Sequence, residues 1–565
     1  MPLVKNDIVT LDITDFNVTG AGVGKTDGVP VFVSGAVIGD TVRAKITKTK
    51  KNYAYARTEE IVTPSADRVK APCPKADTCG SCQLQAYAYE AQLRYKEKKV
   101  RDALIRIGGL DADRTDAVMH PVCGMENPYR YRNKAQYPAG RNAAGDSVFG
   151  FFAVHSHRIV ETEDCLLGPE ENRKILRAVS ESMQIADITA YNEEDGTGYV
   201  RHVLIRKGFS SGRIMVCLVV NGESALSRFR DVLILQLAEI NHIDSVCFNY
   251  NTEKTNVILG AETECIYGRP YIEDTLCGLT FRISAQSFYQ VNPVITEQLY
   301  ETVRRCVSGE AEHAGEGPVV WDLYCGIGTI SLTLAKNGAK HVYGIEIVEE
   351  AVADARENAR INDIQNATFL CGKAEDESLT TDLAQPDVIV VDPPRAGCEE
   401  TLLKTVLRAN PARIVYVSCD PATLARDLKI LVAGGYAVRE IRPYDMFPHT
   451  THVETVVLLS HKKPDTTISV NIAFGEGEGQ ISLDRIAERA ELAKPKEHVT
   501  YKMIQDYVMT NYGLKIHTAQ IAEVKRALGL DMQYEYEEND DKPRPNTPKE
   551  KKDAIKDALK HFELI

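Results

Sequence analysis

The chain has 565 residues, of which 44% are hydrophobic and 26% are charged, as is typical of a globular protein. One hydrophobic core does not suffice for this length, so several domains are expected. No uninterrupted apolar run approaches the about 18 residues of a membrane-spanning helix, so a membrane partner is not expected.

The N-terminus and the fourteen cysteines bear on the cellular compartment. The first residues, MPLVKNDIVTLDITD, contain no apolar core of an export signal. In a protein that is not exported, cysteines act as thiols, metal ligands or catalytic groups rather than as a disulfide framework. We therefore expect a cytoplasmic protein.

Residues 1–62 predict a small β-barrel, because short alternating runs at 7–16, 28–37 and 40–62 are separated by glycines. The overall net charge of −13 argues only weakly against a nucleic-acid partner, since contacts with phosphate are local. Segment 41–57 holds two interleaved tyrosines, Tyr53 and Tyr55, and no acid. Its basic residues are Arg43, Lys45, Lys48, Lys50, Lys51 and Arg57.

A second cluster of this kind, YRYRNK, occupies residues 129–134. Basic side chains between aromatic rings suit single-stranded nucleic acid, because cations meet phosphates while rings stack on bases. A solvated strand face explains either cluster alone equally well.

Residues 63–125 predict an irregular segment followed by a helix within 84–109, which stops at Gly108 and Gly109. The irregular part contains Cys73, Cys79 and Cys82, and a fourth cysteine, Cys165, lies far along the chain. Three close thiols and one distant thiol can hold zinc or an iron–sulfur cluster, and the spacing alone does not separate the two.

Residues 126–285 predict a mostly β central domain with two helices, because strand-like runs dominate at 147–154, 200–208, 213–222 and 255–260. From 286 to 462, strands alternate with helices, which predicts a doubly wound parallel α/β sheet. Residues 463–565 predict an extension with a linker at 475–479, two helices around Gly513 within 500–529, and disorder over 535–553. A packed accessory domain is slightly favoured over a helix-turn-helix-like unit that adds substrate contacts.

The segment WDLYCGIGTIS, 321–331, predicts a strand, a glycine turn and a helix start. Gly326 and Gly328 allow a ligand to approach the backbone, but Ser331 stands where a dinucleotide fingerprint has its third glycine. The next strand ends at Glu346, where a carboxylate can accept the hydroxyls of a ribose. Asp392, in VDPPR, follows another strand and is within reach of the same pocket.

Cys419 lies at the end of an apolar strand, just before Asp420 and Pro421. Asp-Pro is a helix-start signature, with the acid as N-cap and proline at the first helical position. The partial positive charge of a helix start favours a thiolate. Glu454 begins the last strand, so a thiol and a carboxylate are predicted to share one pocket, the former as nucleophile and the latter as base. A buried structural cysteine is the commoner alternative.

The motifs FYQVNP, DLYCGIGTISL, DPPRAG, VSCDPATLARDL and HTTHVE, in this order, resemble the RNA uracil-5-methyltransferase family over roughly residues 1–460. The resemblance implies a class I S-adenosylmethionine-dependent methyltransferase fold, preceded by an OB-like TRAM barrel. It implies that Cys419 adds to carbon 6 of uracil and that Glu454 removes the proton from carbon 5. The residues that it implies for S-adenosyl-L-methionine are Gln290, Tyr324, Glu346 and Asp392. Lys373 is a departure, since family members often carry a polar uncharged or acidic residue there.

The cysteine spacing resembles the 4Fe–4S site of the 23S rRNA branch of this family, which the tRNA branch lacks. The resemblance thus implies that Cys73, Cys79, Cys82 and Cys165 hold a 4Fe–4S cluster, with zinc as the alternative, and that ribosomal RNA is favoured over tRNA as substrate. An inactive RNA-binding iron–sulfur protein is a competing hypothesis, and a nicotinamide dehydrogenase is disfavoured by the missing glycine. No obligate protein partner is evident.

Overall fold

The computed structural model describes residues 3–142, 144–154, 156–193, 195–222, 226–309, 317–462, 501–528 and 547–562. The chain divides into two compact units, Met1–Asp465 and Thr466–Ile565. The predicted linker at 475–479 lies outside the described residues. None of the helices that the structure describes is long and apolar enough to cross a membrane.

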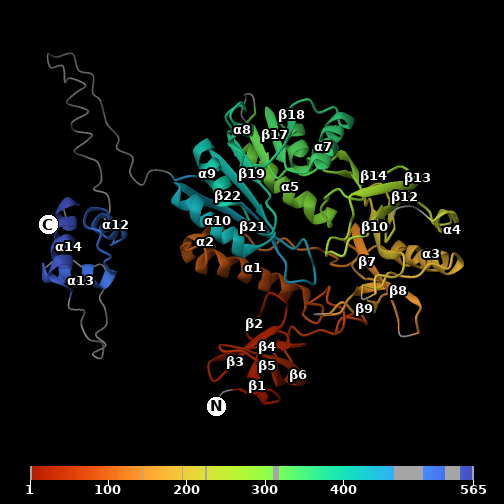
Figure 1. Cartoon of the computed structure of the whole chain (residues 1–565), viewed down its shortest axis with the longest axis horizontal. Coiled ribbons are helices and arrows are strands. Elements are labelled where there is room, and N and C mark those ends of the chain that lie inside the picture. Colours follow the sequence, from red (N-terminus) through yellow and green to blue (C-terminus); the bar gives the residue numbers. More distant parts are fainter. Residues whose placement is uncertain are drawn as a thin grey trace. The chain divides into compact units, whose positions relative to one another are not determined.

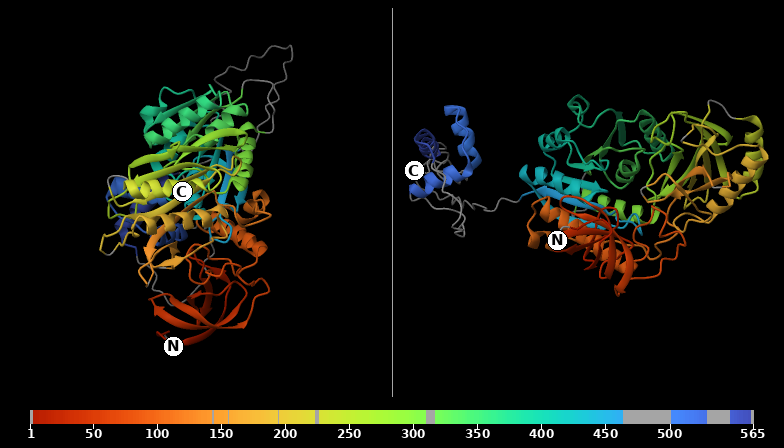
Figure 2. Two further views of the ribbon diagram at one scale, coloured as in Figure 1. Left: turned by 90° about the vertical axis from the view of Figure 1, so that its right-hand side faces the viewer. Right: turned by 60° about the horizontal axis from the view of Figure 1, so that its bottom comes forward.

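A six-stranded sheet with strand order β1-β5-β6-β4-β3-β2 forms the N-terminal barrel, coloured red in Figures 1 and 2. Its strands bury alternate residues, such as Val42, Ala44 and Ile46, in one core, as the alternating sequence pattern predicts. The strands are β1 (Ile8–Asp12), β2 (Asp15–Phe16), β3 (Gly22–Thr26), β4 (Val29–Ser34), β5 (Thr41–Thr49) and β6 (Ala54–Thr63).

Helices α1 (Tyr89–Arg106) and α2 (Ala112–Val118) follow the cysteine-containing segment. Val100 and Leu104 of α1 share a buried core with Leu424 and Leu428 of a later helix, α10 (Pro421–Ala433). The predicted helix within 84–109 is therefore part of the α/β layer structure, although its sequence lies far from that domain.

The central domain is a seven-stranded sheet with strand order β13-β12-β11-β10-β7-β8-β9. Two helices, α3 (Glu171–Ile185) and α4 (Ser227–Ala238), bury apolar residues against it. The strands are β7 (Lys134–Arg141), β8 (Ser147–Phe152), β9 (Ile159–Glu161), β10 (Val200–Lys207), β11 (Ile214–Val220), β12 (Ile243–Tyr250) and β13 (Glu262–Gly268).

The expectation of a strand at 255–260 is wrong, because this segment is an irregular loop between β12 and β13. The side chain of Asn251 donates to the carbonyls of Val257 and Ile258, and the Gly260 N–H donates to the side chain of Asn249. Side-chain hydrogen bonds satisfy the backbone here in place of a β-ladder.

A second seven-stranded sheet, with strand order β18-β17-β16-β19-β20-β22-β21, forms the α/β domain, coloured green to cyan in Figure 1. Neighbouring residues on each strand enter different cores, as Val390 and Val391 do, so both faces are covered. The strands are β16 (Val319–Leu323), β17 (His341–Glu346), β18 (Ala367–Cys371), β19 (Val388–Val391), β20 (Arg413–Ser418), β21 (Tyr436–Tyr444) and β22 (Glu454–His461).

The helices of the α/β domain lie on the two faces of this sheet. The core with α5, α6 and α7 occupies one face, and the core with α1, α9 and α10 occupies the other. A hairpin of β14 (Tyr271–Leu276) and β15 (Leu279–Ser284) packs at the first face. The helices not yet given bounds are α5 (Pro293–Ser308), α6 (Thr329–Lys336), α7 (Glu349–Ile361), α8 (Glu377–Thr380) and α9 (Glu400–Ala409).

The sheet is not fully parallel, because β22 runs antiparallel to both neighbours, β20 and β21. The connection from β21 to β22, residues 445–453, is too short for a crossover helix, so the chain reverses. This reversal brings the start of β22 to the edge of the sheet where β20 ends, with Ser418 opposite Thr455.

The second unit contains α12 (Tyr501–Tyr512), α13 (Thr518–Ala527) and α14 (Lys549–His561) around a core of its own. The predicted helical pair is present, and Gly513 between its helices has a φ of +65°. The expectation of disorder is wrong for 549–553, which begin α14, because Ala554, Ile555, Ala558 and Leu559 form a buried helical stripe. Most of the segment predicted to be disordered lies outside the described residues.

Candidate active site

The glycine turn after β16 places Glu346 at the end of the neighbouring strand β17. The Gly326 N–H donates to the Glu346 carboxylate at 3.1 Å, and the Val348 N–H donates to its other oxygen at 3.0 Å. Apart from Gly326 and its two chain neighbours, no atom of the described residues lies within 4 Å of the position where a Gly326 side chain would begin. A carboxylate thus faces a backbone turn that a ligand can approach closely.

Two further acids support this turn and were not predicted as site residues. The Tyr324 hydroxyl donates to Glu375 at 2.8 Å, and Tyr324 itself has a φ of +71°. Asp322 accepts a hydrogen bond from Ser331 at 2.5 Å, and burial raises its pKa to about 7. Ser331, at the place of the missing glycine, therefore ties strand β16 to helix α6.

Gln290 and Asp392 present polar side-chain groups that have no partner among the described residues. In the described part of the chain neither side chain takes part in a hydrogen bond or an ion pair, although the Gln290 carbonyl accepts from Asn133. Burial, and next the nearby Asp322, raise the pKa of Asp392 to about 7. Unpaired polar groups on buried or half-buried side chains are a common feature of ligand sites.

Cys419 lies between β20 and α10, as the sequence predicts. The Asp420 carboxylate accepts from the N–H groups of Ala422 at 2.8 Å and Thr423 at 3.2 Å, and Pro421 begins the helix. Because Ser418 pairs with Thr455 across the antiparallel strands, Cys419 and Glu454 extend from adjacent positions of neighbouring strands. The structure thus brings the predicted nucleophile and the predicted base together.

Three of the predicted site residues, Cys419, Glu454 and Asp392, interact electrostatically at this edge of the sheet. Burial, and next Asp392, raise the pKa of Glu454 to about 8, and its side chain is 4% exposed. Burial, Glu454 and Asp392 raise the pKa of the Cys419 thiol to about 12. The nearby Arg395 guanidinium opposes both shifts and was not predicted as a site residue.

The expectation that the helix start favours a Cys419 thiolate is wrong for the free protein. Burial and the neighbouring carboxyl groups outweigh the helix end, whose first N–H groups are already bonded to Asp420. The raised pKa favours the neutral thiol of Cys419, so any nucleophilic role of this residue requires a base that accepts its proton.

The four predicted metal-binding cysteines line one small pocket, together with Gln85 and Phe151. Among the residues that the structure describes, no three His, Cys, Asp or Glu side chains are close enough to hold a metal ion. The half-buried Arg132 interacts electrostatically with Cys82 and Cys165, and its guanidinium lies 5.9 Å from the Phe447 ring centre.

The basic segment 41–57 contributes to a cleft of about 1070 Å³ between the barrel and helix α1. Phe32, Tyr53 and Tyr55 lie there with ring centres 5.4 to 5.7 Å apart. The cations of this cleft are Lys48, Lys50, Arg57, Lys98 and Lys99. Arg43, by contrast, pairs with Glu60 on the barrel surface.

The second basic cluster, 129–134, is not an open surface for nucleic acid. Tyr131 is buried, Arg130 forms a two-pronged ion pair with Asp164, and burial lowers the pKa of Lys134 to about 7. The alternation of tyrosines and cations therefore reflects internal packing between the central domain and its neighbours.

Comparison with known proteins gives two matches to family models. Residues 251–462 match the tRNA (Uracil-5-)-methyltransferase model, and residues 4–58 match the TRAM domain model.

Relatives with similar sequences are described as RNA methyltransferases. An uncharacterized RNA methyltransferase of Halalkalibacterium halodurans is 47% identical over 465 residues, covering 82% of this chain and 98% of that protein. An uncharacterized RNA methyltransferase of Listeria innocua is 45% identical, covering 81% and 99%. About a fifth of this chain has no counterpart in either relative.

Among solved structures, the Pyrococcus abyssi tRNA (uracil-54, C5)-methyltransferase in complex with S-adenosyl-L-homocysteine matches with a TM-score of 0.64 at 28% identity. The match covers 80% of this chain and 100% of that chain. The α/β domain thus has the fold of S-adenosylmethionine-dependent methyltransferases, joined to an N-terminal TRAM domain. The chain belongs to the RNA uracil-5-methyltransferase family.

Proposed function

We propose that this protein transfers a methyl group from S-adenosyl-L-methionine to carbon 5 of uracil in ribosomal RNA, by way of a covalent bond between Cys419 and the base. The observation that carries the proposal is the adjacency of Cys419 and Glu454, which the antiparallel pairing of β20 and β22 imposes. Both groups are partly or fully buried beside Asp392.

In the proposed reaction, the Cys419 sulfur bonds to carbon 6 of uracil while its proton passes to a neighbouring carboxylate. The electrons of the C5–C6 double bond move onto the ring carbonyl, so carbon 5 becomes nucleophilic. After carbon 5 has gained its methyl group, Glu454 removes the remaining proton from carbon 5. The C5–C6 double bond reforms and the sulfur leaves.

The residues proposed for cofactor binding fit a nucleoside with a charged amino-acid tail. Glu346 is held by two backbone N–H groups at the end of β17, the usual place of a ribose ligand in such sheets. Tyr324 lies beside it. Gln290 and Asp392, whose side chains have no hydrogen-bond partner among the described residues, are free to contact the other parts of S-adenosyl-L-methionine. When bound, S-adenosyl-L-methionine supplies the methyl group on a sulfonium centre.

The cleft between the barrel and α1 supports RNA as the partner, because cations and clustered rings suit phosphates and unstacked bases. The four cysteines line one pocket, although no three of them lie close enough in the described structure to hold a metal ion. We propose this pocket as a 4Fe–4S site, with zinc as the alternative, and such a site favours the ribosomal branch of the family. Transfer RNA is the second candidate substrate, since the matched archaeal structure is a tRNA methyltransferase.

Methyl labelling distinguishes the two substrates. We expect the purified protein, given labelled S-adenosyl-L-methionine and RNA from cells lacking the gene, to place label in 5-methyluridine of 23S rRNA and not of tRNA. Nucleoside analysis of the separated RNAs measures this. Label in tRNA alone would replace the ribosomal assignment, and label in neither would refute the proposed activity.

Metal analysis tests the cysteine site. We expect protein purified without oxygen to contain about four irons per chain and a broad visible absorption band, and Cys82→Ser to lose both. Cys265→Ser, on strand β13 away from this pocket, is the matched control. A colourless wild type that carries only zinc would assign the site to zinc.

A further inference from the structure

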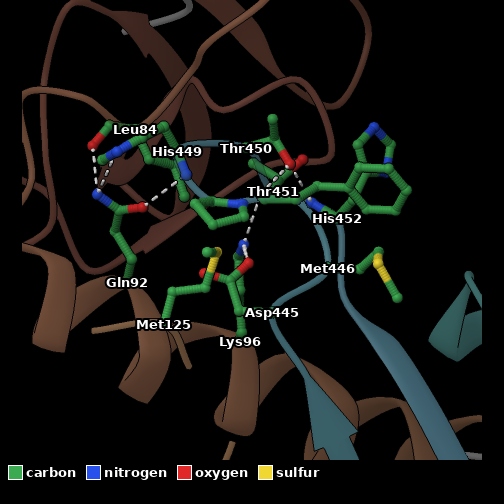
Figure 3. A network of polar contacts seen from close by, with 12 residues as sticks. Leu84, Gln92, Lys96, Met125, Asp445, Met446, His449, Thr450, Thr451 and His452 are labelled. Carbon is green, nitrogen blue, oxygen red and sulfur yellow. Dashed lines mark hydrogen bonds and ion pairs between the residues drawn. The ribbon is translucent and has the colours of Figure 1, made fainter. Parts of the chain in front are cut away.

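The loop 445–453, which ends at Glu454, is held by a buried network of polar contacts (Figure 3). At its centre, the Lys96 ammonium on helix α1 is paired with the Asp445 carboxylate, and both side chains are 0% exposed. Lys96 also donates to the Phe447 carbonyl at 3.1 Å, and the Tyr89 hydroxyl donates to Asp445 at 2.9 Å. The first part of the loop is thereby fixed to α1.

His449, in the middle of the loop, is a second anchor. Its backbone has a φ of +66°, and its carbonyl accepts from the N–H groups of Gln83 and Leu84, both at 3.0 Å. Its own N–H donates to Gln92 at 3.1 Å, and the Tyr129 ring stacks on its ring at 4.5 Å between centres. The backbone that follows Cys82 therefore contacts this loop directly.

Near Glu454 the loop has a third anchor. Lys99 donates to the Thr451 carbonyl at 2.7 Å, and the Thr451 hydroxyl donates to the Val18 carbonyl of the barrel at 3.0 Å. Gln92, Lys96 and Lys99 are spaced by four and three residues, so they lie on one face of α1. One helix face thus holds the beginning, the middle and the end of the loop.

The Glu454 carboxyl group itself has no such support. Within the described residues it accepts no hydrogen bond and forms no ion pair, so its position depends on its backbone. That backbone is held by the pairing of Glu454 with Tyr444 and by the loop that precedes it. Replacing a buried ion pair with apolar residues is often neutral or stabilising, so stability alone is a weak reason for Lys96–Asp445.

We propose that Lys96 and Asp445 are positioning residues, which hold the 445–453 loop so that Glu454 reaches the proton on carbon 5. This inference rests on the proposed function. If it is correct, replacing Lys96 or Asp445 slows the last step, in which the proton is removed and the cysteine is released. Formation of the covalent bond should not slow. A displacement of about 1 Å at a reacting group slows such a step by up to about a hundredfold.

The test compares Lys96→Met with Arg101→Ala. Arg101 lies on the same helix as Lys96, and its replacement removes an exposed ion pair with Asp116 of α2. Each variant is mixed with an rRNA fragment and S-adenosyl-L-methionine. Denaturing gels measure the covalent protein–RNA adduct, nucleoside analysis measures 5-methyluridine released, and thermal unfolding measures stability. We expect Lys96→Met to release product about ten- to a hundredfold more slowly while the adduct accumulates. Arg101→Ala should match the wild type.

Two further variants cover the case in which Lys96→Met does not fold. Lys96→Met/Asp445→Leu removes both buried charges, and Asp445→Asn removes one without changing the shape; either is expected to show the same excess of adduct over product. The inference is overturned by normal release, by adduct and product falling in parallel, or by failure of all three variants to fold. A Glu454→Gln protein that forms no adduct would instead refute the proposed function, whatever the Lys96 variants do.

Discussion

Cys419→Ala is expected to abolish formation of 5-methyluridine, lowering turnover by about 10³-fold or more. Without the sulfur, carbon 5 of uracil remains too poor a nucleophile to accept a methyl group. The residue is partly exposed and makes no hydrogen bond that the described residues would lose, so the variant should fold and retain its affinity for RNA. Incorporation of labelled methyl groups into rRNA measures the effect.

Cys265→Ala provides the matched control, since this cysteine has similar exposure but lies on strand β13 of the central domain. It should retain full activity. Methylation by Cys419→Ala at the wild-type rate would mean that no covalent bond to the base is needed, and the mechanism would have to be abandoned.

Glu454→Gln is expected to trap a covalent protein–RNA adduct that survives denaturation. Glutamine cannot accept the proton from carbon 5, so the ring is methylated but the Cys419–C6 bond does not break. A denaturing gel with labelled RNA should show a shifted band in Glu454→Gln and none in the double variant with Cys419→Ala. A free, fully methylated product would show that another group removes the proton.

The raised pKa of Glu454 gives this step a pH dependence. Because its carboxyl group has a pKa of about 8, it is mostly protonated at neutral pH, and only the ionised form accepts a proton. Product release by the wild type should therefore rise with pH up to about 8 and then level off. Adduct decay in Glu454→Gln should show no such rise.

The start of helix α10 was predictable from the local sequence. The Asp420 side chain caps the helix by accepting from the N–H groups of Ala422 and Thr423, and Pro421 occupies the first helical position. The barrel was predictable for a similar reason, since alternation along strands such as β5 reflects burial on one side. These signals need only a few neighbouring residues, whatever the rest of the chain does.

The state of Cys419 and the fate of the second basic cluster were not predictable. The thiol pKa depends on Glu454 and Asp392, which approach Cys419 from two other strands. The sequence suggested that Arg130 could bind phosphate, but in the structure Arg130 forms an ion pair with Asp164, which lies 34 residues away in the sequence. The charge state and burial of a side chain depend on residues that only the tertiary fold brings near it, and a local sequence pattern does not identify these residues.

The sequence by itself determined the class of fold and the positions of Glu346 and Cys419 at the ends of strands, and it predicted which groups react. The sequence predicted that Cys419 and Glu454 share one pocket, but only the tertiary structure decided their adjacent positions, because these follow from the reversed direction of β22 and its register with β20. Only the tertiary structure also joined helix α1 to the loop before Glu454, about 350 residues away along the chain. Local patterns reflect interactions between near neighbours, whereas strand direction and buried ion pairs depend on how the whole chain minimises exposed apolar surface and unpaired polar groups.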